Sequence, residues 1–111
     1  MRLAHVSDIH LGMEGAAADP FEVAKAVVAD LAAISDALDL VVVSGDLTEH
    51  ARPDTFARFE AMFGTIGTPV VVVPGNHDGP AGFHHYSETS PVFADWNITN
   101  RVVELGSQVE I

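Results

Sequence analysis

The sequence predicts an α/β fold with a parallel sheet, because three strand-like segments alternate with two helix-like segments over the first 78 residues. Segments 40–43 and 70–73 are unbroken runs of Leu and Val, which are typical of strands buried on both faces. Polar residues follow each strand: Asp8, Asp46 and Asn76 lie 38 and then 30 residues apart. Each interval is long enough for one crossover helix of a βαβ unit.

The first strand is expected over residues 2–7 and is followed by a glycine-containing loop. A helix is expected to start at Asp19, with Asp as the N-cap, Pro20 at the first helical position and Glu22 at the third. Apolar residues then recur at helical spacing to the end of this segment. They are Phe21, Ala24, Val27, Val28, Leu31, Ile34 and Leu38.

The second helix is expected over residues 53–66, with Phe56, Phe59, Phe63 and Ile66 on one stripe. Beyond it the pattern is less regular. Residues 79–100 are rich in Gly, Pro, Ser, Asn and aromatics, and they predict a long irregular loop, anchored by packing of Phe93 and Trp96. Segments 101–105 and 108–111 predict a hairpin around a Gly-Ser turn.

The composition excludes several classes of function. The 111 residues suffice for one domain, and 48% of them are apolar. Five basic residues against 16 acidic ones give a formal charge of −11, which argues against a broad basic face for nucleic acid or anionic membranes. The absence of cysteine excludes disulfides and thiolate sites. No segment is apolar for long enough to be a signal peptide or a membrane span, so we expect a cytoplasmic protein.

Three polar clusters follow the three predicted strands: Asp8 with His10, Asp46 after a glycine, and residues 75–78. The carboxyl ends of parallel strands meet at one edge of a sheet, where ligands bind in open α/β folds. Carboxylate, imidazole and amide groups suit Mn²⁺, Fe²⁺ and Zn²⁺. Asp46 follows the central strand and is therefore placed to bridge two ions. Taken singly, each residue also fits ordinary turn chemistry, so the metal-site interpretation depends on all three clusters together.

The remaining histidines have plainer interpretations. His5 lies within the first strand and is expected to be a hydrogen-bonded core residue. His50 follows the second cluster and is a candidate for substrate contact at the mouth of the site. His84 and His85 lie in the predicted loop, where exposure or structural hydrogen bonding is the simpler expectation and metal or substrate contact the alternative.

Segments 5–11 (HVSDIHL), 43–49 (VSGDLTE) and 73–78 (VPGNHD) resemble the first three signature blocks of the calcineurin-like metallophosphoesterases. The second block is most similar to the branch that contains bacterial cyclic-nucleotide phosphodiesterases, while related DNA-repair nucleases share all three blocks. The resemblance implies a four-layer α/β/β/α sandwich, of which this chain supplies the β-α-β-α-β parallel-sheet half. It also implies a dinuclear enzyme that hydrolyses phosphoesters with metal-generated hydroxide.

By this resemblance, Asp8 and His10 bind a first metal ion, Asp46 bridges both ions and Asn76 binds the second. The two ions are divalent Mn²⁺, Fe²⁺ (or Fe³⁺) or Zn²⁺. His77 faces the scissile phosphate and protonates the leaving oxygen, and Asp78 orients it. The expected substrate is a small phosphodiester, with cyclic nucleotides as one candidate. A DNA or RNA nuclease and a non-catalytic metal-binding or interaction module are the alternatives.

The family carries two further histidine blocks, a lone His and a Gly-His-x-His, and neither occurs in these 111 residues. We therefore expect residues 1–111 to form the N-terminal portion of a single metallophosphoesterase domain that stops where the second sheet begins. The 111-residue chain alone is accordingly expected to hydrolyse phosphodiesters poorly or not at all.

Overall fold

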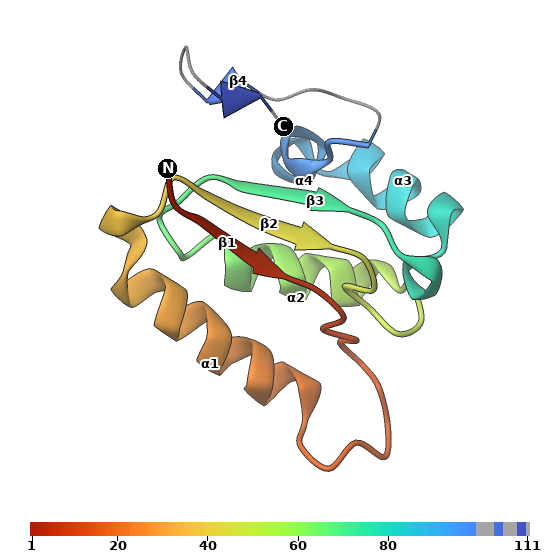
Figure 1. Ribbon diagram of the computed structural model, residues 1–111. Helices are drawn as coiled ribbons and strands as arrows, with labels where there is room; N and C mark the ends of the chain where they lie inside the picture. The colour runs from red at the N-terminus through yellow and green to blue at the C-terminus, as the bar shows by residue number, and fades with distance from the viewer. Residues whose placement is uncertain (100–103, 106–108, 111) are drawn as a thin grey trace.

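The computed structural model describes residues 1–99, 104–105 and 109–110, and it confirms the predicted α/β fold (Figure 1). Three parallel strands form one sheet in the order β1-β2-β3. The strands are β1 (Leu3–Val6), β2 (Leu40–Ser44) and β3 (Val70–Val73). The helical elements are α1 (Pro20–Ala33), η1 (Ser35–Ala37), α2 (Pro53–Phe63), η2 (Asn76–Asp78), α3 (Pro80–Thr89) and α4 (Pro91–Trp96).

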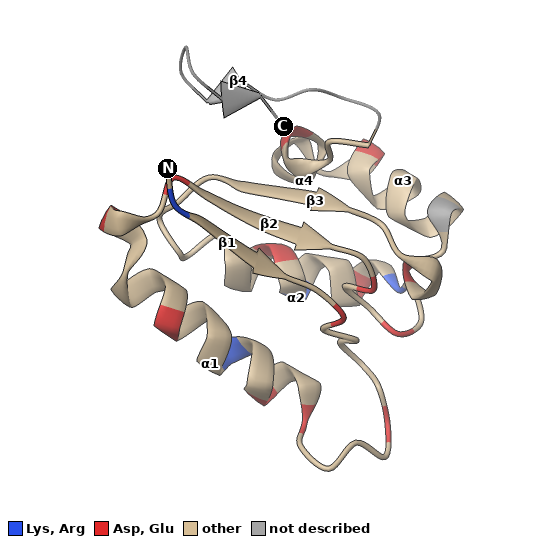
Figure 2. Cartoon of the chain, in the orientation of Figure 1, with Lys and Arg blue, Asp and Glu red and all other residues tan. Residues whose placement is uncertain are grey.

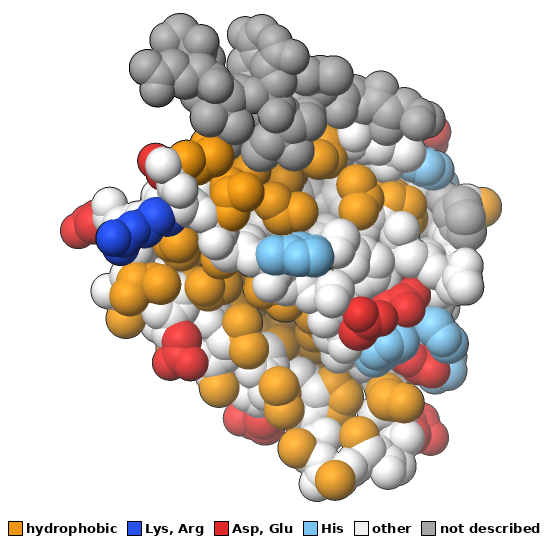
Figure 3. All heavy atoms as spheres, viewed as in Figure 1, with side chains coloured by type: hydrophobic (Ala, Val, Ile, Leu, Met, Phe, Trp, Pro, Cys, Tyr) orange, Lys and Arg blue, Asp and Glu red, His pale blue; other side chains and the backbone are white. Residues whose placement is uncertain are grey.

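Alternate strand residues face the helical side of the sheet and belong to the hydrophobic core. The register pairs Ala4 with Val41 and Val41 with Val70, so their side chains share this face. The opposite face carries His5, which is exposed, so the expectation of a core histidine is wrong. Its Nε2 lies within hydrogen-bonding distance of Ser44 Oγ on the next strand. Hydrophobic side chains also show on this side of the molecule (Figure 3).

The prediction of an irregular loop over residues 79–100 is wrong, because most of this segment forms the helices α3 and α4. A proline occupies the first turn of both α3 and α4, where its missing N–H costs no hydrogen bond. Ser90 separates the two helices, and its Oγ accepts from the backbone N–H of Phe93 as the N-cap of α4. The Pro and Ser residues that suggested a loop therefore mark the starts of helices in this segment.

Packing of aromatic rings explains why α3 and α4 form. Phe93 of α4 is fully buried, and its ring centroid lies 4.9 Å from Tyr86 of α3 and 5.9 Å from Phe56 of α2. Trp96 packs on Phe59 and Phe93, which confirms the predicted anchoring role of Phe93 and Trp96. Because helices as short as α3 and α4 are only marginally stable by themselves, burial of this aromatic cluster supplies most of their stability.

A polar contact crosses the same interface. Glu60 of α2 accepts hydrogen bonds from Tyr86 Oη, at 3.1 Å, and from Ser90 Oγ. Burial raises the pKa of Tyr86, and its hydrogen bond to Glu60 acts in the same direction. The tyrosine hydroxyl therefore remains a donor that joins α3 to α2.

Both crossover helices are shorter than predicted. α1 ends at Ala33 and is followed by η1, whose Ser35 carbonyl accepts from Thr68 Oγ1. α2 ends at Phe63, although Ile66 beyond it is still buried, as the apolar stripe requires. Beyond each helix the chain turns into the next strand. The helix ends at the residue where these tertiary contacts replace the helical hydrogen bonds.

At the C-terminal end, β4 (Glu104–Leu105) and β5 (Val109–Glu110) pair antiparallel, which confirms a hairpin in this region. The other residues of the predicted hairpin lie outside the described part of the chain. Within the described residues, no helix combines the length and apolar character that crossing a membrane requires.

We predict that Phe93→Ala lowers the free energy of unfolding by about 3–5 kcal/mol, since it empties the centre of the aromatic cluster. Val92→Ala is the matched control in the same helix. Val92 is 50% exposed, so its truncation is expected to change stability by less than about 0.5 kcal/mol. Urea denaturation of both variants measures the difference, and equal effects would contradict the packing of α4.

Candidate metal centre

The loops that follow β1 and β2 are joined by backbone hydrogen bonds past the ends of the strands. Asp8 N–H donates to the Gly45 carbonyl (3.1 Å), and His10 N–H donates to the Asp46 carbonyl (2.9 Å). Leu11 N–H donates to the Leu47 carbonyl at 3.1 Å. The sheet-like ladder therefore extends beyond the strands and holds both predicted clusters at one edge of the sheet (Figure 1).

The loop after β3 approaches Asp46 so closely that only glycine fits at position 75. A Cβ atom on Gly75 would lie 2.3 Å from the Asp46 nitrogen and 2.8 Å from the Gly45 Cα. Two residues later, His77 N–H donates to Asp46 Oδ1 at 2.8 Å. The third cluster is thus placed against the second, as the parallel topology predicts.

Three of the predicted ligands adopt left-handed backbone conformations that non-glycine residues rarely use. The φ angles are +58° at Asp8, +50° at His10 and +53° at Asp46. Each such residue costs about 1–3 kcal/mol, and the surrounding hydrogen bonds must offset this strain. Strained residues of this kind concentrate at functional sites, and three of the four non-glycine residues with positive φ among the described residues are predicted ligands, the fourth being Ala51.

The side chains of these residues converge. His10 Nε2 lies 3.7 Å from Asp8 Oδ1 and 3.8 Å from Asp46 Oδ2. Single ligand atoms of His10, Asp46 and His77 lie within 4.8 Å of one another. Ligand atoms bound to one ion at about 2.0–2.2 Å have separations only slightly shorter than the two distances from His10 Nε2. The donor set of imidazole and carboxylate therefore fits a divalent transition metal.

Asn76, the other predicted ligand, begins the η2 turn that carries His77, and its side chain is exposed. Its position places it at the same edge of the sheet as Asp46. Its role as a ligand of a second ion stays a prediction.

Glu49 is a functional candidate that the sequence reasoning missed. Its Oε2 lies 2.8 Å from His10 Nδ1, and its Oε1 lies 3.5 Å from His77 Nδ1. With Nδ1–H donating to Glu49, His10 presents the lone pair of Nε2 to Asp8 and Asp46, as metal binding needs. The signal was present in the sequence, since Glu49 ends the second motif.

Asp78 occupies a different place from the one expected. Its carboxylate is fully buried and accepts from the backbone N–H groups of Leu47 (3.1 Å), Thr48 (2.8 Å) and Gly75 (2.9 Å), as well as from Thr48 Oγ1. It therefore ties the second loop to the third, while Glu49 is the carboxylate that lies against His77. The family resemblance implied the Asp78–His77 pairing, but in the η2 turn the Asp78 carboxylate bonds to the second loop instead.

The other histidines are distributed as follows. His50 follows Glu49 in the chain and lines a pocket together with Leu11 and Arg52. His84 lies on α3, where its ring packs edge-on against Phe83 and its Nδ1 lies 3.4 Å from Asn97 Nδ2, while His85 on the same helix is exposed. These contacts favour a structural role for His84.

Carboxylates dominate the centre. Acidic residues colour the loops that follow β1 and β2 (Figure 2), and Asp8, Asp46 and Glu49 all lie close to His10. Among the described residues, no Lys or Arg forms an ion pair with any of these three. A bound divalent cation would relieve this concentration of negative charge.

Comparison with known proteins identifies the family. The sequence profile of the calcineurin-like phosphoesterases matches residues 1–109, nearly the whole chain. The chain belongs to this family. The parallel sheet and the clustered ligands agree with the N-terminal half of such a fold. The family hydrolyses phosphoesters with divalent metals, which agrees with the donor set found at the edge of the sheet.

The chain is similar to curated proteins of several specificities. It is 34% identical over 90 residues to the glycerophosphodiester phosphodiesterase GpdQ of Enterobacter lignolyticus (78% of this chain, 32% of the relative). It is 39% identical over 87 residues to the DNA double-strand break repair protein Mre11 of Archaeoglobus fulgidus (70% and 19%). A probable cyclic nucleotide phosphodiesterase of Fibrobacter succinogenes is 30% identical over 80 residues (70% and 31%). The matches thus span about a third or less of these relatives' lengths.

We predict that Gly75→Ala separates the second and third loops, because its φ of −113° suits alanine but its Cβ would clash with the backbone of Asp46. The amide proton of His77 should then lose its hydrogen bond to Asp46 and shift upfield in NMR spectra.

Gly12→Ala is the control. Its Cβ meets nothing within 4 Å, but its φ of +91° makes the change strained, at about 1–2 kcal/mol. This variant should lose stability and keep the His77 shift. An unchanged His77 amide in Gly75→Ala would contradict the close approach of the two loops.

Proposed function

We propose that this chain forms the N-terminal, ligand-bearing portion, residues 1–111, of a cytoplasmic metal-dependent phosphodiesterase domain. The convergence of Asp8 and Asp46 on His10 Nε2, while Glu49 holds His10 Nδ1, is the observation that carries the proposal. Such an arrangement selects the imidazole tautomer that binds metal and leaves the carboxylates available as further ligands.

The centre is proposed to bind two divalent metal ions, which are Mn²⁺, Fe²⁺/Fe³⁺ or Zn²⁺. Asp8 and His10 would hold the first, Asp46 would bridge both, and Asn76 would contribute to the second. Bound ions of this kind lower the pKa of water and neutralise charge on phosphate oxygens. His77 N–H donates a hydrogen bond to Asp46 Oδ1, which fixes the orientation of the proposed bridging carboxylate.

His77 is proposed to give a proton to the leaving ester oxygen. Its Nδ1 lies 3.5 Å from Glu49 Oε1, which orients the ring and leaves Nε2 for the substrate. The side chain is 47% exposed, so a bound ester has access to it. The Glu49 carboxylate thus orients both His10 and His77. Asp78 holds the loops after β2 and β3 together through its hydrogen bonds to Leu47, Thr48 and Gly75.

The proposed substrates are small phosphodiesters, and the named activities of two relatives, on glycerophosphodiesters and on cyclic nucleotides, belong to this class. A nuclease activity is the second candidate, because the chain also resembles Mre11 over 70% of its length. The formal charge of −11 opposes binding of a long polyanion and favours a small substrate.

We predict that Asp46→Asn lowers metal content more than any other single change, because Asp46 is proposed to contact both ions. The asparagine keeps an oxygen for His77 N–H, so the loops should stay in place. Asp36→Asn, an exposed change in η1, is the control. Metal stoichiometry after dialysis measures the effect, and full occupancy in Asp46→Asn would exclude the bridging role.

We predict that His77→Ala retains metal but lowers turnover of alkyl phosphodiesters by about 10²–10⁴-fold, as expected for loss of a proton donor. Esters with nitrophenyl leaving groups need less protonation and should lose less. His85→Ala on α3 is the control. The assay uses the complete gene product with Mn²⁺, and equal losses for both ester types would rule out the leaving-group role.

A further inference from the structure

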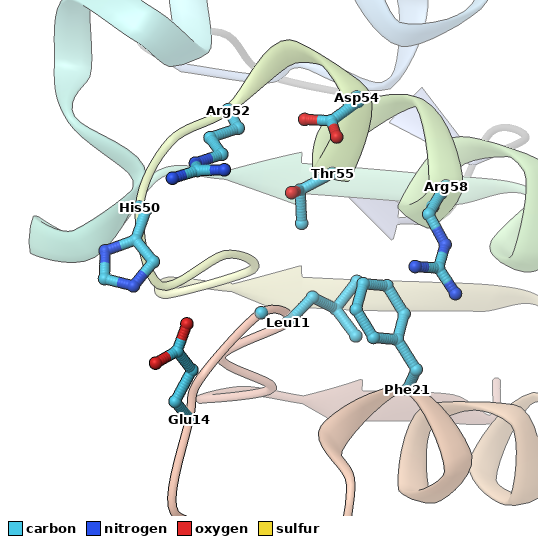
Figure 4. Close-up of a pocket in the computed structure, with 9 residues that line it drawn as sticks. Leu11, Glu14, Phe21, His50, Arg52, Asp54, Thr55 and Arg58 are labelled. Carbon is cyan, nitrogen blue, oxygen red and sulfur yellow. The ribbon is translucent and has the colours of Figure 1, made fainter.

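A pocket of about 210 Å³ lies among residues of the loops after β1 and β2 and of helices α1 and α2 (Figure 4). Two of its lining residues, Leu11 and His50, directly follow His10 and Glu49 in the chain. Glu49 N–H donates to the Leu11 carbonyl at 3.0 Å, so the two loops that carry these residues are held together. The pocket and the proposed metal centre therefore share the same two loops.

The inner wall of the pocket is small and partly apolar. Leu11 is fully buried, Thr55 is 9% exposed and Phe21 is half-buried. Figure 4 shows the Thr55 side chain directed toward the space above Leu11. The guanidinium carbon of Arg58 lies 3.5 Å from the centroid of the Phe21 ring, which holds this cation at one side.

Charged side chains of both signs surround this wall. Arg52 and Arg58 are balanced by Glu14 and Asp54, so the formal charge of the lining is zero in a chain whose total is −11. None of the four takes part in the ion pairs found between described residues. Their hydrogen-bonding groups therefore remain available to a ligand.

The mixture of donors and acceptors indicates the class of ligand. A hydroxyl group both donates and accepts, so a neutral, hydroxyl-rich group can bond to guanidinium and carboxylate together. A second anionic group would face Glu14 and Asp54, and a cation would face the arginines. The volume is below the roughly 300–1,000 Å³ of sites for drug-sized ligands, which favours a group as small as a glycerol or a single pentose.

We propose that this pocket binds the polyol part of the substrate, a glycerol- or pentose-sized group, while the attached phosphodiester lies at the metal centre. The proposal rests on the proposed function and adds to it the residues that select the alcohol. Arg52 and Asp54 are specificity-determining residues in this assignment, and Thr55 supplies a further hydroxyl from the inner wall.

The test compares three phosphodiesters of equal charge by NMR titration of the isotope-labelled chain, without metal and with Zn²⁺. They are dimethyl phosphate, glycerol methyl phosphate and ribose 5-(methyl phosphate). The polyol esters should shift the amide resonances of Gly12 and Thr55, whereas dimethyl phosphate should leave them unchanged. A shift with only one polyol ester identifies which polyol the pocket accepts. Equal shifts with all three esters, or no shift at either amide, would overturn the proposal.

Variants then test the named residues. Arg52→Gln and Asp54→Asn should each weaken binding of the polyol esters by about 3–10-fold, the effect of one hydrogen bond, with dimethyl phosphate binding unchanged. Lys25→Gln, which removes an exposed cation of α1 outside this pocket, should change nothing. Losses that are equal for all three esters would instead show a general charge effect and overturn the assignment.

These outcomes are separable from those of the proposed function. Shifts at Gly12 and Thr55, combined with no turnover by the complete gene product in the presence of Mn²⁺, would support the polyol pocket and count against the phosphodiesterase. Turnover of all three esters at equal kcat/KM, without shifts at these amides, would support the phosphodiesterase and overturn the pocket.

Discussion

The buried carboxylate of Asp78 is the interaction on which the candidate centre depends. Its two oxygens accept four hydrogen bonds, from the backbone of Leu47, Thr48 and Gly75 and from the Thr48 hydroxyl. A buried charge is tolerated only when it is satisfied in this way, and here the donors come from two separate loops. The requirement to satisfy one carboxylate therefore positions the loops that carry Asp46 and His77.

The fixed loops allow strain where the chemistry is proposed. Asp8, His10 and Asp46 are held with positive φ angles, which local preference alone would not select. The backbone ladder between the first two loops and the close approach at Gly75 supply the opposing interactions. The result is a set of imidazole and carboxylate groups that lie close enough together to fit one divalent metal ion.

Charge divides the surface near the centre into two regions with different chemistry. The carboxylates around His10 form a region that favours a cation, while the neighbouring pocket balances Arg52 and Arg58 against Glu14 and Asp54. In the functions proposed above, phosphate chemistry belongs to the first region and recognition of the alcohol to the second, and both regions use residues of the same two loops. In an acidic chain, this arrangement suits a small ester better than a polyanion.

The sequence by itself determined the parallel β-α-β-α-β order, the family, and the residues that converge at the strand ends, because burial periodicity and motif spacing are local properties of the chain. It did not predict α3 and α4, since their Pro and Ser residues also fit a loop and only the aromatic contacts of Phe93 distinguish the two. It also missed Glu49 and misassigned Asp78. Which carboxylate lies against His77 depends on how the η2 turn is directed by bonds to a loop about 30 residues away, and only the tertiary structure decides that.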